Sequence, residues 1–315
     1  MRSSARSLTW LLPSLVLEAV ALGGCLFQPA EAVTAPSYCA AYFEHIPTKS
    51  PKLFLFPIVS RALPLLATLP NGLASDFRLI EFSSDGQAIY GQTLHSWDGI
   101  TKIEFKPARH GVLRGSVGIG TISSLVALQP SGRVRVSGVA RVRNSVVCGV
   151  FEIDPNSAAF HQLYIGRFPD CGGAISPDGR RVLHSSRSEG NLLSILDVGT
   201  GTAQPIGPHL TAATWSPDGR WIAAIQGSSG ATRVVLIDAM DISKRKDLGR
   251  THDSQAQWSP DSKYLLVSKQ DSQCGPYLWS LETIDVRTGK RTEVRSSHCK
   301  IFQNATGWMN LEAVR

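Results

Sequence analysis

The sequence predicts an all-β chain that folds as a six-bladed β-propeller, and three observations lead to this fold class. A turn motif recurs at intervals of 40 to 47 residues, in segments that begin at Phe82 (FSSDG), Leu128 (LQPSG), Ile175 (ISPDG), Trp215 (WSPDG) and Trp258 (WSPDS). An apolar residue followed by an acid comes 19 to 24 residues after the turn positions Asp85, Ser131, Asp178, Asp218 and Asp261, at Ile103-Glu104, Ile153-Asp154, Leu196-Asp197, Ile237-Asp238 and Ile284-Asp285. The intervening runs are short and rich in Val, Ile, Leu, Tyr and Trp. A repeat of this length with strand-like content is typical of a propeller blade.

Residues 1–32 predict an export signal. Arg2 and Arg6 precede a mostly apolar stretch from Leu8 to Phe27, and Ala30-Glu31-Ala32 then resembles a cleavage site. The segment ending at Cys25 (LGGC) resembles a bacterial lipoprotein box, in which the cysteine is acylated. We expect an exported protein, and a membrane-anchored lipoprotein, a periplasmic protein and a secreted protein all remain open. Residues 33–51 are interpreted as a linker.

The propeller itself is expected over residues 52–315. In the copy around Trp258, strand a ends in SQAQWS, strand b is KYLLVSK, strand c is PYLWSLETIDV and strand d is RTEVRS. Two fragments flank the five copies: Lys52 to Pro70 is typical of strands c and d, and Ala305 to Arg315 of strands a and b. Together they make a sixth blade that closes the ring and protects its edges. Seven blades is the alternative.

The repeated SPDG turn has a structural interpretation. Proline presets the second turn position, the Ser and Asp side chains bond nearby N–H groups, and glycine accepts a positive φ. We therefore expect turn roles for Asp85, Asp178, Gly179, Asp218, Gly219 and Asp261, and packing between blades for Trp215, Trp258 and Trp308. A calcium site would need more oxygen ligands nearby, and no D-x-D-x-D cluster is present, so no metal is expected.

Two segments, Trp215–Ala224 (WSPDGRWIAA) and Trp258–Val267 (WSPDSKYLLV), resemble the TolB-type β-propeller repeat of bacterial exported proteins. The resemblance extends over about Leu53 to Arg315 and implies a propeller fold. It implies little about function, because TolB carries an α/β domain before its propeller. We expect no such domain in the short stretch between the signal and Lys52.

The cysteines suggest disulfides within blades. Strands c and d form an antiparallel hairpin, so the start of c lies beside the end of d. This makes Cys148–Cys171 and Cys274–Cys299 reasonable pairs in an oxidising compartment, with buried thiols as the alternative. Cys39 is left over. No C-x-x-C motif or Cys/His spacing suggests zinc.

A candidate ligand site lies in the loops between strand d and the next strand a. His209 and His252 each stand six residues before the Trp of their copy, and Asp76 stands six before Phe82. In a propeller these loops share one face around the central opening, so the three residues are candidates for a common rim. The alternative is that they are ordinary polar loop residues.

No catalytic signature accompanies the repeats. The chain has no G-x-S-x-G, sialidase Asp-box, P-loop or dinucleotide fingerprint, so no cofactor is expected. The net charge of +7 is mild, and the run Lys244-Arg245-Lys246 is interpreted as solvated, so no nucleic-acid partner is expected.

The leading hypothesis is a non-enzymatic, monomeric propeller that binds a protein, peptide or envelope component through one face. Its contact with the membrane would be only through the possible lipid anchor. The alternative is a lyase or hydrolase of polysaccharide or peptide with residues around the central channel, and a third possibility is a stabilising or signal-sensing module. Fold alone does not decide among them.

Overall fold

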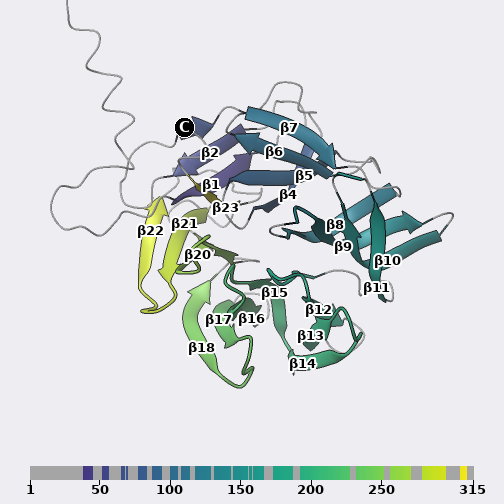
Figure 1. Cartoon of the computed structure of the whole chain (residues 1–315). Coiled ribbons are helices and arrows are strands. Elements are labelled where there is room, and N and C mark those ends of the chain that lie inside the picture. Colours follow the sequence, from purple (N-terminus) through teal and green to yellow (C-terminus); the bar gives the residue numbers. More distant parts are fainter. Residues whose placement is uncertain are drawn as a thin grey trace, which may run out of the picture.

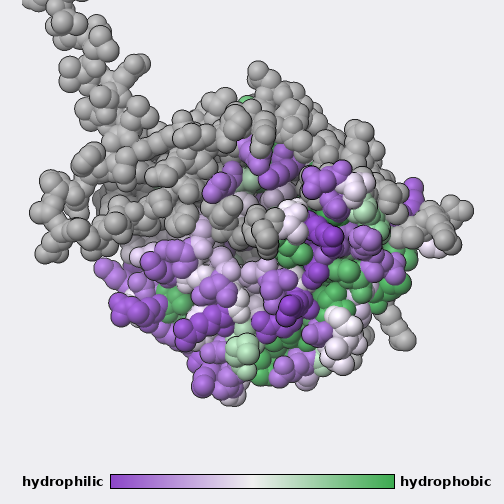
Figure 2. Space-filling model, viewed as in Figure 1, coloured by the Kyte–Doolittle hydropathy of each residue, from purple (hydrophilic) through white to green (hydrophobic). Residues whose placement is uncertain are grey.

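The computed structural model places the strands in six antiparallel sheets arranged around a ring (Figure 1), and hydrophilic residues cover much of the described surface on the side shown in Figure 2. The sheets follow one another in chain order, so each neighbours the sheet before it and the sheet after it. The structure describes residues 38–44, 52–56, 65–67, 69, 77–83, 87–93, 100–105, 108–113, 118–128, 131–142, 145–154, 156–157, 159–166, 173–186, 192–227, 232–251, 256–270, 279–295 and 306–310.

Three sheets belong to the first half of the chain. The first contains β23 (Thr306–Asn310), β1 (Tyr38–Glu44), β2 (Lys52–Phe56) and β3 (Leu65–Ala67), in that order. The second contains β4 (Phe77–Phe82), β5 (Ala88–Thr93), β6 (Ile100–Phe105) and β7 (Ala108–Leu113). The third contains β8 (Gly118–Ala127), β9 (Val134–Val142), β10 (Ser145–Ile153) and β11 (Phe160–Gly166).

The second half of the chain supplies the other three sheets. The fourth contains β12 (Arg181–Ser186), β13 (Leu192–Asp197) and β14 (Ala203–Gly207). The fifth contains β15 (Leu210–Trp215), β16 (Trp221–Gln226), β17 (Thr232–Asp238) and β18 (Arg245–Thr251). The sixth contains β19 (Gln257–Trp258), β20 (Tyr264–Gln270), β21 (Trp279–Asp285) and β22 (Arg291–Arg295).

The prediction of a β-propeller is confirmed, but the predicted count of six blades is wrong, and so is the alternative of seven. The described residues form five complete four-stranded blades, whereas the fourth sheet has only three strands among them. Where its strand a was expected, Ile175 forms an isolated bridge to Val182, and the Ala174 carbonyl accepts the Leu183 N–H at 2.9 Å. A Cβ at Gly173 would lie 1.5 Å from the Leu183 carbonyl oxygen, so the chain before Ala174 approaches β12 too closely for a residue with a side chain.

The ring also closes differently from the prediction. The described part of the C-terminus contributes strand a (β23), and the N-terminus contributes three strands instead of two. β1 takes the place of strand b, pairing with β23 through Ala40↔Trp308 and with β2 through Ala40↔Phe56. This strand lies inside the expected linker of residues 33–51, because the short run YCAAYFE was not interpreted as a strand. The expected strand b after Asn310 lies outside the described residues.

The hydrophobic core lies between neighbouring sheets. Leu183 and Ile195 of the fourth sheet pack with Trp215 and Ile222 of the fifth, as typical of stacked blades. Similar clusters join the second sheet to the third, the third to the fourth and the fifth to the sixth. At the closure of the ring, Ala40 and Trp308 of the first sheet pack with Leu266 and Leu281 of the sixth. Successive side chains along a strand point to opposite faces of its sheet, so the two faces pack against two different neighbouring sheets.

Candidate functional site

In the SPD turns, the polar side chains form hydrogen bonds within the turn. The hydroxyls of Ser176, Ser216 and Ser259 donate to Oδ1 of Asp178, Asp218 and Asp261 at 2.5, 2.5 and 2.7 Å. The same Oδ1 atoms accept the N–H groups of Arg180, Arg220 and Lys263 at 3.0, 3.0 and 3.2 Å. Gly179 and Gly219 have φ of +73° and +72°, and Ser262 takes the same position at +59°. These acids therefore shape turns, while Asp85 lies outside the described residues.

The turn bonds also fix the ionisation of Asp178. Burial opposes its charged form, but hydrogen bonds from the Ser176 hydroxyl and the Arg180 N–H outweigh this and lower the pKa of Asp178. The carboxylate thus stays charged at neutral pH and is committed to local bonds. A general acid or base works best when its pKa lies near the working pH, and the pKa of Asp178 lies below that range.

The second repeated acid shapes the hairpin between strands c and d. Asp197 Oδ1 accepts the N–H groups of Gly199 and Thr200 at 2.9 and 2.8 Å, and the bonds from Thr200 lower the pKa of Asp197. The corresponding Asp154, Asp238 and Asp285 accept the N–H groups of Asn156, Met240 and Thr288 at 2.8, 2.9 and 2.7 Å. Both repeated acids are therefore architectural in the described copies.

The three repeat tryptophans link successive blades. The indole N–H groups of Trp215, Trp258 and Trp308 donate to the carbonyls of Ala174, Thr214 and Gln257 at 3.0, 3.3 and 3.0 Å. Each acceptor immediately precedes the residue that holds the Trp position in the blade before. The Ala174 carbonyl also accepts the Leu183 N–H at 2.9 Å, so the Trp215 indole makes the second hydrogen bond to that oxygen. The three indole N–H groups are thereby paired, although their rings are buried between the sheets.

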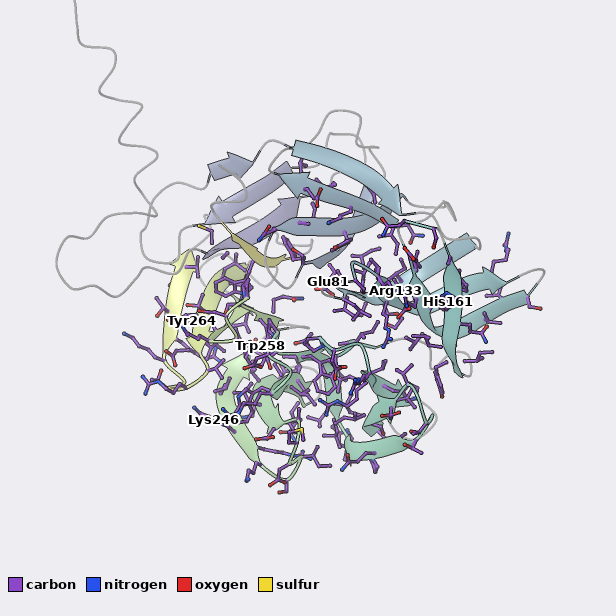
Figure 3. The ribbon with its side chains drawn as sticks, in the orientation of Figure 1. Glu81, Arg133, His161, Lys246, Trp258 and Tyr264 are labelled. Atoms are coloured by element: carbon purple, nitrogen blue, oxygen red, sulfur yellow. The ribbon has the colours of Figure 1, made fainter. Side chains whose placement is uncertain are left out.

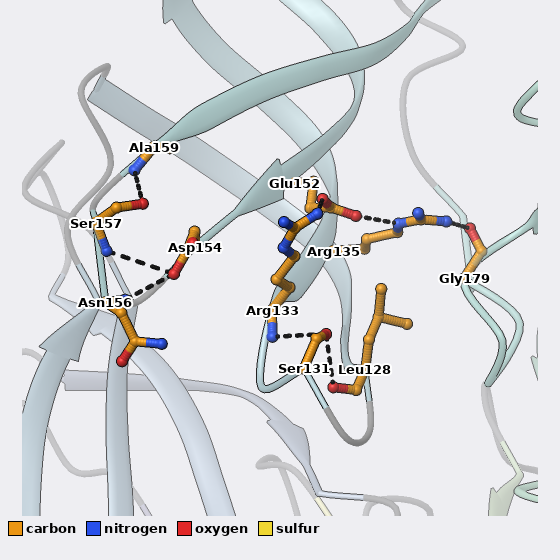
Figure 4. Close-up of polar contacts among 10 residues, drawn as sticks. All are labelled: Leu128, Ser131, Arg133, Arg135, Glu152, Asp154, Asn156, Ser157, Ala159 and Gly179. Carbon is orange, nitrogen blue, oxygen red and sulfur yellow. Dashed lines mark hydrogen bonds and ion pairs between the residues drawn. The ribbon is translucent and has the colours of Figure 1, made fainter.

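Charged side chains make a second set of links between blades. Glu152 bonds Arg133 at 2.9 Å and Arg135 at 2.8 Å, and Arg135 Nη1 reaches the Gly179 carbonyl of the next blade at 2.7 Å (Figure 4). Burial of Glu152 opposes its charge, but the hydrogen bonds and charges of Arg135 and Arg133 outweigh it and lower the pKa of Glu152. Sequence reasoning missed this cluster, because the contact of Arg133 and Arg135 with Glu152 depends on the register of β9 against β10, which the repeat spacing does not give.

The basic run Lys244-Arg245-Lys246 is solvated only in part. Arg245 Nη2 donates to the Ile206 carbonyl of the preceding sheet at 2.7 Å. Lys246 Nζ donates to the Val286 and Arg287 carbonyls of the following sheet at 2.9 and 2.6 Å. Successive strand residues point to opposite faces, so these two cations hold opposite neighbours. Lys244, with its side chain 71% exposed, fits the predicted solvated character.

The predicted rim is described at one position. His209 is exposed in the turn between β14 and β15, with φ of +57°, and its carbonyl accepts the Gly227 N–H at 3.3 Å. A left-handed backbone is uncommon for a residue other than glycine. Asp76 and His252 lie outside the described residues, so their convergence with His209 stays a prediction.

Glu81 is a titratable residue that sequence reasoning did not single out. It lies on β4 toward the middle of the ring, whereas Lys246 and His161 lie farther out (Figure 3). Burial raises the pKa of Glu81 to about 7, against a lowering contribution from the Phe82 N–H. The alternation of FRLIEF could have indicated it, because Glu81 breaks an otherwise apolar end of the strand.

We expect Glu81 to make stability depend on pH. Its folded pKa is raised, so ionisation costs the folded state stability as pH rises from 4.5 through about 7. Wild-type stability should therefore fall over this range relative to Glu81→Gln, by at most about 1.4 kcal/mol for each pH unit. Thermal unfolding of both proteins across the range measures the difference. Parallel curves would mean that Glu81 ionises normally.

The described residues hold no group of three or more His, Cys, Asp or Glu side chains placed to bind a metal ion. Across the same residues, the structure contains no helix with the length and apolar character needed to span a bilayer. Cys148 is disulfide-bonded, and its predicted partner Cys171 lies outside the described residues. Cys25, Cys274 and Cys299 also lie outside the described residues, while Cys39 is 1% exposed in β1.

Comparison with known proteins supports the fold. No protein family matches the sequence, and no curated protein matches it. Among solved structures, TolB from Acinetobacter baumannii is similar at a TM-score of 0.61 and 15% identity, with 86% of this chain and 66% of that chain covered. A putative TolB from Agrobacterium tumefaciens is similar at 0.53 and 14%, covering 82% and 88%. A chain of a nidogen–laminin complex is similar at 0.58 and 9%, covering 86% and 97%. In fold, the chain is a β-propeller similar to these TolB structures.

Proposed function

We propose that this chain is an exported binding protein whose propeller holds a protein or peptide of the cell envelope. The partner binds on the rim face, defined here as the face of the loops that join strand d to the next strand a. The observation that carries the proposal is His209, an exposed side chain held in a left-handed turn directly before an inner strand. Residues kept in uncommon backbone conformations occur preferentially at functional sites.

The distribution of polar groups supports a binding role. In the described blades the repeated acids are bonded within their turns, and the buried Glu152 is bonded by two arginines. These groups stabilise the ring and leave the loops to provide specificity, as in other scaffolds where function lies in loops. Two of the similar structures are TolB proteins, and a third comes from a complex between proteins. Export is consistent with the signal-like residues 1–32 and with the disulfide at Cys148.

The rim predicts the result of a capture experiment. The exported chain, used as bait in envelope extract, should recover a partner that the variant H209A/H252A/D76A recovers at least about tenfold less, because a few residues of an interface carry most of its binding energy. His161→Ala is the matched control, since His161 is exposed on the outer strand β11. Quantitative mass spectrometry measures the recovery. Equal recovery by all three baits would exclude the rim as the binding site.

A second candidate function rests on Glu81. Its position toward the middle of the ring and its pKa of about 7 suit a general acid or base in a central channel. The chain would then act as a lyase or hydrolase of polysaccharide or peptide. Glu81→Gln should abolish turnover of any such substrate without altering partner capture, which separates the two functions. A substrate turned over equally by both proteins would exclude Glu81 as the catalytic group.

A further inference from the structure

The outer strand of the third sheet is an open edge. β11 is the last strand of its sheet, and no other strand of the described residues pairs with its outer side. An edge strand of this kind presents a row of N–H and C=O groups to which another strand can bond. β11 has seven residues, as many as β18 and more than β14 or β22. It therefore offers a full-length template for strand pairing.

The other outer strands carry features that discourage such pairing, and β11 lacks them. Charged residues occur in β18 and β22, β14 contains Pro205, β7 contains Arg109, and β3 has only three residues. Charge, proline and shortness are common ways in which proteins protect a sheet edge. The sequence of β11, FHQLYIG, contains no proline and no Asp, Glu, Lys or Arg. Among the described outer strands, β11 alone is longer than three residues and free of both charge and proline.

A β-bulge in β11 does not distinguish it from the other outer strands. Leu163 has no partner on β10, because the pairing moves directly from Tyr164 to Gln162. The outer strand pairs of the fourth, fifth and sixth sheets have a bulge at the corresponding place. The three residues on either side of Leu163 remain regularly paired with β10. The bulge therefore adds twist to an edge that stays extended at both ends.

Apolar side chains are exposed beside this edge. In the described part of the chain three large apolar side chains are exposed, and two of them belong to this sheet: Ile165 on β11 at 52% and Val146 on β10 at 60%. Phe160, Gln162 and Ile165 share one face of β11, since they pair with alternate residues of β10. Phe160 is partly buried and stacks on Phe151, with ring centres 5.1 Å apart. A strand added at this edge would shield Ile165 from water.

We propose that β11 pairs in antiparallel orientation with β11 of a second copy of this chain. A two-fold axis between the strands then presents the same patch from both copies and joins two blades into one continuous sheet. The Phe160 end of each strand meets the Ile165 end of the other on the same face, and aromatic and β-branched residues form favourable cross-strand pairs.

Charge favours a second copy at this edge. The chain carries a net charge of +7, so two copies repel each other, and they can approach best where the contact itself is uncharged. A centred pair of β18 strands would instead bring Lys246 of one copy against Arg250 of the other. The dimer differs from the monomer that the sequence led us to expect. It is independent of partner capture at the rim, because it uses the backbone of an outer strand.

Analytical ultracentrifugation of the exported full chain tests the proposal. One strand pair buries less surface than a standard interface, so we expect a weak dimer with a dissociation constant above about 1 μM. Q162K/I165K should raise this constant at least about tenfold, because it places two lysines of each copy at the shared edge. Both side chains are exposed in the single chain, so the variant should fold normally, and its midpoint of urea unfolding checks this.

The matched control is A203K/Q204K. It adds the same charge at two exposed residues of β14, another outer strand, and its dissociation constant should stay within about twofold of that of the parent protein. The rim variant H209A/H252A/D76A should also dimerise like the parent protein, so failure of the rim proposal leaves this one standing. Hydrogen exchange locates the contact: as protein concentration rises, the amides of β11 should exchange more slowly, while those of β14 should not change.

Several results would overturn the proposal. A chain that stays monomeric at about 1 mM would do so, as would a dimer that leaves hydrogen exchange in β11 unchanged. Equal weakening of the dimer in Q162K/I165K and A203K/Q204K would assign the effect to net charge instead of the edge. Slower exchange in β11 that appears only after addition of envelope extract would make a different protein the occupant of this edge.

Discussion

Trp215→Ala should destabilise the propeller by about 3 to 5 kcal/mol, the range for removing a buried tryptophan. The side chain is 7% exposed and packs with Leu183, Ile222 and Ile237 between two sheets. Its truncation leaves a cavity there. It also removes one of the two hydrogen bonds to the Ala174 carbonyl and the ring beneath the Arg181 guanidinium, which lies 4.7 Å from the ring centre.

Two further variants separate these contributions. Trp215→Phe keeps most of the apolar burial but loses the indole N–H, and we expect a loss of about 0.5 to 1.5 kcal/mol for this one hydrogen bond, because the Ala174 carbonyl keeps the Leu183 N–H. Trp221→Ala is the control for the same chemical change, because Trp221 is only partly buried. The urea concentration at the midpoint of unfolding measures these losses of stability, provided that the slope of unfolding free energy against urea concentration is unchanged. A Trp215→Ala protein as stable as Trp221→Ala would show that the tryptophan contacts between blades contribute little to stability.

The sequence predicted the periodic features of the fold because each is encoded within one repeat. The SPD turn is a local solution for the backbone, so Ser216, Asp218 and Gly219 indicate it without knowledge of neighbouring blades. The alternating apolar runs likewise indicate the strands on either side. A feature repeated in register could therefore be read from residue types and spacing alone.

The departures occur where the repeat degenerates. Among the described residues, the fourth sheet has only the isolated bridge Ile175↔Val182 where its inner strand was expected. At the ring closure, β1 has no turn motif before it, since the motif would have to span the two ends of the chain. The sequence does not indicate that β1 pairs with β23, which the structure shows through pairs such as Ala40↔Trp308.

The candidate sites were predictable to a smaller extent. The offset of His209 from Trp215 placed it in a loop between blades, but its left-handed backbone comes from the two-residue turn between β14 and β15. Glu81 could not be ranked above other glutamates, because its raised pKa depends on burial by residues distant in the sequence.

Glu152→Ala should cost about 3 kcal/mol, at the lower end of the range for breaking a buried ion pair. The Glu152 side chain is 7% exposed and holds two guanidinium groups, and its removal leaves Arg135, 21% exposed, without a counter-ion. Arg133 is 50% exposed and can be rehydrated, which limits the loss. Because Arg135 also bonds the Gly179 carbonyl, we expect the contact between the third and fourth sheets to loosen.

The pH dependence of stability tests whether the charge of Glu152 causes this loss. The folded pKa of Glu152 is lowered, so its contribution is present above 4.5 and is lost as pH falls through the folded pKa. The stability gap between wild type and Glu152→Gln should therefore narrow in acid, as measured by urea unfolding at a series of pH values. Arg233→Gln is the control, because Arg233 and Asp247 are 44% and 47% exposed and such pairs contribute less than about 1 kcal/mol. A gap that is constant with pH, or no larger than that of the control, would show that packing outweighs the ion pair at this blade contact.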